Sequence, residues 1–151
     1  QTIWKPIAQN LRKILTTREL KKYYQDTFYP VNNLLLIGLG SKLRAKDIPE
    51  LASCEGIVYT IRDLDTDWTR GVINIPKEIL KKGKLTTKSS VEEVKENQIV
   101  KKWFKKELLK CKKDLSSLEV KLAKANESLT TRFCTGLTSP LYKLSKQYLS
   151  D

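Results

Sequence analysis

The sequence predicts an α+β fold, in which a small sheet with flanking helices is followed by a long helix of the coiled-coil type. Two short runs of apolar and β-branched residues, 34–37 and 57–62, predict strands. A third run, 68–75, follows a polar stretch that can turn, so 57–75 predicts a β-hairpin. Apolar residues three and four positions apart over 104–129 predict the long helix. With 151 residues, the chain is long enough to bury a core of its own.

The first 40 residues predict two helices and a strand. A helical apolar stripe comes first, with spacings of three and four residues, and consists of Trp4, Ile7, Leu11 and Leu15. A second, short helix is expected to open at Thr16 or Thr17, and Pro30 is expected to end that region. The run 34–37 lies between two asparagines and a glycine, which is typical of a buried strand.

The middle of the chain predicts a hairpin and then a linker. Residues 47–52 could form one or two helical turns, and Pro76 suits the first position of a helix that runs through Leu80. Residues 81–90 contain four lysines and no periodic apolar pattern, so we expect a mobile segment there. Ser89 or Ser90 is the expected N-cap of the long helix, whose first turn holds two glutamates.

The clearest pattern in the chain is a heptad-like seam with spacings of 4-3-4-3-4-3-4. Its members are Phe104, Leu108, Cys111, Leu115, Leu118, Leu122, Ala125 and Leu129. The seam predicts dimerisation as a coiled coil, through self-association or with another coiled-coil protein. Two alternatives stay open: an amphipathic helix packed on its own domain, or an intramolecular pair with the C-terminal helix. The stretch from Gly136 to Pro140 is expected to break the long helix before that last segment.

These elements predict four parts along the chain. A small α+β head spans 1–83, and a basic linker spans 84–90. The long amphipathic helix follows over 91–132, and a C-terminal helix covers 137–151. The chain lacks methionine, so Gln1 is not expected to be the natural start.

The charge of the chain points to a polyanionic partner. Lys and Arg number 29 against 17 Asp and Glu, which gives a net charge of +12. On the long helix, lysines cover most of the surface away from the seam, and the candidate nucleic-acid-binding residues are Lys101, Lys102, Lys105, Lys106, Lys110 and Lys113. Such a face would bind DNA or RNA without reading its sequence, because neutralised phosphates release counterions. The alternative is that these lysines only keep the protein in solution.

Several kinds of functional site are not indicated. There is no histidine, which excludes His-based triads and His metal sites. The three cysteines are far apart and predict reduced, buried thiols. The run Gly38 to Lys42 has the wrong order for a phosphate-binding loop, and Asp63, Asp65 and Asp67 lack the glycine and the distal glutamate of a calcium loop. We therefore expect no metal, no cofactor and no enzymatic activity. The longest apolar run has four residues, so no membrane span is expected.

One stretch resembles a known family. It runs from Gly56 through an apolar strand to Asp63, then to Trp68 and a second strand up to Val72. This order is similar to the head-domain hairpin of the end-joining scaffold superfamily, which includes the partner of DNA ligase IV and its paralogues. In that family a small β-rich head precedes a dimeric coiled-coil stalk, and the plan here is similar. The resemblance implies a nuclear homodimer in a DNA-repair assembly. Trp68 is expected to anchor the core of the head in any case.

Taken together, these features predict a non-enzymatic dimeric scaffold that associates with nucleic acid or a chromosome-associated assembly. We expect it inside the cell and in the nucleus. The alternative function is a coiled-coil adaptor subunit of a multiprotein complex that makes no nucleic-acid contact.

Overall fold

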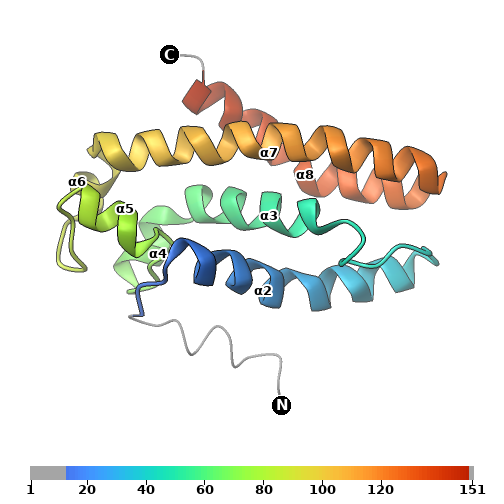
Figure 1. The fold of residues 1–151 in the computed structure, drawn as a ribbon, viewed down its shortest axis with the longest axis horizontal. Coiled ribbons are helices and arrows are strands. Elements are labelled where there is room, and N and C mark those ends of the chain that lie inside the picture. Colours follow the sequence, from blue (N-terminus) through green and yellow to red (C-terminus); the bar gives the residue numbers. More distant parts are fainter. Residues whose placement is uncertain (1–12, 150–151) are drawn as a thin grey trace.

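A computed structural model describes residues 13–149, and within that range the protein is a bundle of α-helices (Figure 1). No strand or sheet is found among the described residues, so the predicted α+β fold is wrong. The helices are α2 (Thr17–Gly38), α3 (Pro49–Arg62), α4 (Leu64–Thr69), α5 (Lys77–Lys82), α6 (Val91–Glu96), α7 (Gln98–Ala125) and α8 (Ser128–Leu149). Of the first predicted stripe, Trp4, Ile7 and Leu11 lie outside the described residues.

Helix α3 is the centre of the bundle, between α2 on one side and α7 on the other in Figure 1, and it also packs against α8. Nine of its 14 residues are buried, and they are spread around the whole helix. This explains why the predicted strand 57–62 is helical. A helix that is apolar on every side is typical of a buried central element, and a short β-branched run inside it cannot be told from a buried strand.

The predicted hairpin is a corner between two helices. The polar stretch expected to turn lies in α4, where Asp65 and Asp67 occupy the first turn and interact favourably with the helix dipole. Gly71 has a φ of 77°, a conformation that glycine adopts without strain, and the chain continues to Pro76 without regular structure. Trp68 lies on α4 and is 8% exposed, and its indole Nε1 donates to the carbonyl of Ser89 at 2.8 Å.

Helix α2 includes both Pro30 and the run 34–37, which were expected to end a helix and to form a strand. Its start agrees with the sequence, since Thr16 and Glu19 form a capping box. Within 34–37 only Leu36 is fully buried, whereas Leu34 is 72% exposed. A buried strand would cover both faces of the run, so this one-sided burial fits the helix.

The segment expected to be a mobile linker is held at several points. Asn97 Nδ2 donates to the carbonyl of Gly83 at 3.0 Å, and Trp68 binds the carbonyl of Ser89. Ser90, one of the two N-caps that the sequence predicted, caps α6 in a capping box with Glu93. The predicted helix over 91–132 is divided, because the side chain of Asn97 caps a new helix, α7.

Helices α7 and α8 form an antiparallel pair joined by a tight corner at Asn126, which has a φ of 53°. The break expected between Gly136 and Pro140 is absent, since α8 runs through both residues. Proline lacks the N–H that would bind the carbonyl of Gly136, but the hydroxyl of Ser139 donates to that carbonyl at 2.9 Å. Ser139 thus supplies a donor for the carbonyl that Pro140 would otherwise leave without one.

Candidate nucleic-acid interface

The predicted lysine face lies on the outer side of α7. Five of the six candidates are exposed, namely Lys102, Lys105, Lys106, Lys110 and Lys113. Lys101 is partly buried and pairs with Glu96, with Nζ and Oε2 2.7 Å apart. Because the apolar stripe of α7 is covered by the protein, the lysines between its members must point outward.

The excess charge of the molecule is concentrated on two helices. Helices α7 and α8 together carry twelve Lys and Arg residues against three Asp and Glu residues, and α8 contains no acidic residue at all. On α7, Glu107 and Asp114 line a cavity together with Lys110, on the flank away from the other candidate lysines. The outer face of α7 therefore presents lysines with few carboxylates between them.

The predicted dimerisation seam is used inside the chain. Phe104, Leu108, Cys111, Leu115, Leu118 and Leu122 are each at most 6% exposed, and they belong to the core shared with α3 and α8. This is the intramolecular packing that the sequence left open as an alternative. The seam is not available to a second copy in this fold, because its side chains already have partners.

The end of the seam does not continue the pattern. Leu129 is 59% exposed, since α7 ends at Ala125 and Leu129 belongs to α8. A straight heptad register therefore cannot be followed across the corner at Asn126.

Helix α8 adds residues that sequence reasoning missed. An open hollow of about 620 Å³ lies where the two helices meet, and its lining combines Lys112 of α7 with Tyr142, Lys143, Ser145, Lys146 and Leu149 of α8. Nothing in the sequence places residues 142–146 beside Lys112, because that neighbourhood depends on how α7 and α8 pair.

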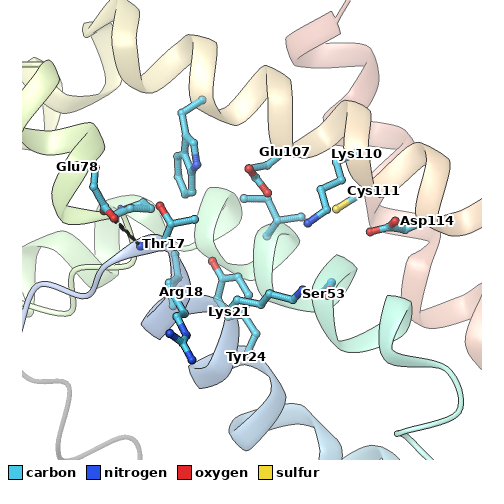
Figure 2. A pocket seen from close by; sticks show the side chains of 14 residues that line it. Thr17, Arg18, Lys21, Tyr24, Ser53, Glu78, Glu107, Lys110, Cys111 and Asp114 are labelled. Carbon is cyan, nitrogen blue, oxygen red and sulfur yellow. Dashed lines mark hydrogen bonds between the residues drawn. The ribbon is translucent and has the colours of Figure 1, made fainter.

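A second candidate is the cavity of about 450 Å³ in Figure 2, between α2, α3 and α7. Its lining is apolar where Leu20, Ile57 and Trp103 meet. Three cationic and three acidic side chains also line it, namely Arg18, Lys21, Lys110, Glu78, Glu107 and Asp114. Because these charges balance, the cavity shows no preference for an anion or a cation.

Three of the side chains that line the cavity are held in ways that do not activate them. Hydrogen bonding to Cys54 and burial raise the pKa of the Cys111 thiol, so it stays protonated and unreactive. Burial also raises the pKa of Tyr24, whose hydroxyl is 2.6 Å from Thr60 Oγ1. Glu78 is occupied in structure, since its carboxylate accepts the backbone N–H of Thr17 at the start of α2 (Figure 2). Neither Cys111 nor Tyr24 is therefore set up as a nucleophile, and Glu78 already has a structural partner.

The two motifs that resembled ligand loops bind groups of the protein itself. In the loop after α2, Lys42 N donates to Glu127 Oε1 at 2.9 Å, and Ser41 Oγ donates to the other carboxylate oxygen. The carboxylate of Glu127 thus occupies the position at this loop that a bound phosphate would take.

The three alternating aspartates are also engaged. Asp63 pairs with Arg62, Asp65 with Lys95, and Asp67 accepts from Asn74. Within residues 13–149, no group of three His, Cys, Asp or Glu side chains is placed to hold a metal ion.

The same part of the chain contains no helix that is both long enough and apolar enough to cross a bilayer. No family model, curated protein or solved structure matches the chain. Any functional interpretation therefore depends on the charge and geometry of the protein's own surface.

Proposed function

We propose that the protein is a non-enzymatic nucleic-acid-binding protein that contacts phosphates through the outer face of α7. The observation that carries the proposal is the exposure of five lysines on one helix whose other side is committed to the core. Rigid attachment matters, because a lysine face on a packed helix keeps its charges together and the backbone needs no ordering at binding. Binding through phosphates is independent of sequence.

The positive charge that would attract phosphates extends from α7 to α8. Helix α8 adds Arg132, Lys143 and Lys146, and no carboxylate on that helix opposes them. The adaptor function, in which the lysines only aid solubility, remains the alternative. Nuclear localisation, a place in a DNA-repair assembly and the identity of protein partners stay predictions from the sequence.

The test replaces the lysine face and measures binding. The variant carries Lys→Gln at Lys101, Lys102, Lys105, Lys106, Lys110 and Lys113, and titrations at low salt use duplex DNA, single-stranded DNA and RNA. We expect the unmodified chain to bind with an affinity that falls steeply with salt, the log–log slope being about 0.9 per phosphate contacted on duplex DNA. The variant should lose this binding.

A matched control separates the face from the net charge. Six exposed lysines elsewhere can be changed to Gln in the same way, namely Lys46, Lys77, Lys81, Lys82, Lys84 and Lys88. Both variants lose the same total charge, so only the α7 variant should lose binding. Equal losses would show that overall charge, and not this face, attracts the polyanion. Absence of binding by the unmodified chain to all three probes would contradict the proposal and favour the adaptor function.

A further inference from the structure

The groove between α7 and α8 combines cations from both helices with aromatic rings. One hollow of about 480 Å³ is lined by Lys95, Glu96 and Gln98, by Lys101, Lys102 and Lys105 of α7, and by Gln147 and Tyr148 of α8. The second hollow, described above, contains Lys112 and Tyr142. Lys105 and Lys112 are two helical turns apart, about 10 Å along the axis. No residue lines both hollows, but the end of α8 contributes to each, through Tyr148 in the first and Leu149 in the second.

The two tyrosines differ in how much of the ring is exposed for stacking. The ring of Tyr148 packs edge-on against Phe104 with the centroids 5.9 Å apart, so it is fixed and partly covered. Tyr142 is 55% exposed and lies beside Lys112, Lys143 and Lys146. An exposed aromatic ring among lysines is what a stacked base and its flanking phosphates require.

The carboxylates do not oppose a bound phosphate chain. Glu96 is the acidic residue in the lining of these two hollows, and Lys101 already neutralises it. Both hollows therefore offer a positive surface along their length.

Resting on the proposed function, we propose that this groove binds single-stranded nucleic acid, with a base stacked on Tyr142 and the phosphates held by lysines of α7 and α8. A duplex keeps its bases stacked on each other, and it can present only phosphates to the same lysines. A single strand can turn a base face towards the ring. The groove should therefore prefer single strands over duplex at equal salt.

The experiment measures the affinity of the full chain for a single-stranded DNA oligonucleotide, a single-stranded RNA of the same sequence, and duplex DNA. Tyr142→Ala should weaken binding of both single strands by about 5- to 100-fold and leave duplex affinity unchanged. Tyr142→Phe should keep single-strand binding, because the ring remains. Leu34→Ala, which truncates an exposed apolar side chain on α2, controls for changes in surface alone.

The outcomes distinguish this inference from the proposed function. If Tyr142→Ala binds single strands as tightly as the unmodified chain, while the six-lysine variant loses binding, stacking on Tyr142 is wrong and the proposed function stands. Equal losses on duplex and single strands would also overturn stacking. An abasic oligonucleotide provides an independent check, since it should bind the unmodified chain and Tyr142→Ala equally. If the unmodified chain binds none of the probes, both proposals are overturned together.

Discussion

A close approach of α2 to α3 predicts an effect whose sign is unusual for a glycine in a helix. Gly56 lies in the middle of α3, and a Cβ placed there would clash with Cγ of Tyr24 on α2. Replacing an ordinary helical glycine by alanine stabilises a protein by about 0.5–1 kcal/mol, because alanine loses less backbone freedom on folding. At Gly56 the clash must outweigh that gain.

The magnitude follows from what holds the tyrosine in place. The contact falls at the root of the ring, and the ring cannot swing away freely because its hydroxyl hydrogen-bonds Thr60 at 2.6 Å. Overpacking a dense core costs about 1–3 kcal/mol, and loss of one hydrogen bond adds about 1 kcal/mol. After subtracting the alanine gain, Gly56→Ala should destabilise the protein by about 2 kcal/mol, or roughly 4–8 °C in Tm.

Gly136 provides the matched control. It also lies inside a helix, but a Cβ there would have nothing within 4 Å. Gly136→Ala should therefore stabilise the protein by about 0.5–1 kcal/mol in urea unfolding. In a Tyr24→Ala background the clash partner is gone, so Gly56→Ala should then be neutral or stabilising. The reasoning is refuted if Gly56→Ala stabilises the unmodified chain as Gly136→Ala does.

Two further predictions concern buried groups. Trp68→Ala should cost about 3–5 kcal/mol in urea unfolding, since it leaves a cavity and an unpaired Ser89 carbonyl; an unchanged midpoint would show that the ring is dispensable. Burial raises the pKa of Glu55 to about 7, against the opposing effect of the hydrogen bond from Asn32. Because the folded pKa is the higher one, the stability associated with the neutral carboxyl is complete below about pH 4.5 and is lost as pH rises to about 7, by roughly 3 kcal/mol. Glu55→Gln should flatten this part of the stability profile, and a profile with the same slope would contradict the assignment.

Local signals in the sequence predicted two of the helix starts, those of α2 and α6. Ser90 followed by Glu93 marks a capping box that the structure contains, and Thr16 with Glu19 marks the start of α2. These motifs work because the hydrogen bonds involved close within four residues and need no tertiary partner.

The predictions from sequence failed for the helices at the centre of the bundle. The run 57–62 has the composition of a strand, and its helical state depends on α2, α7 and α8 surrounding it. The same limit applies to the seam of α7, because its spacing fits a partner helix from the same chain as well as one from a second chain. Only the packing shows that α3 and α8 cover it.

The candidate interface was predicted in part. The outward direction of Lys102, Lys106 and Lys113 follows from the period of the helix, and the structure places them there. Tyr142 could not be assigned to the same surface, because the sequence indicated a helix break before it. The hydrogen bond from the Ser139 hydroxyl to the carbonyl of Gly136 supports the continuing helix, but only the structure shows it.

The position of α3 also limits how the chain can be divided. A protease that cuts within 84–90 would separate α2–α5 from α6–α8, yet α3 contributes core side chains to both sides of that cut. Neither fragment would contain the partners that its half of the core needs. The fragments should therefore stay together as a nicked, noncovalent complex, and expressing either one alone should give a chain that folds only when the other is added.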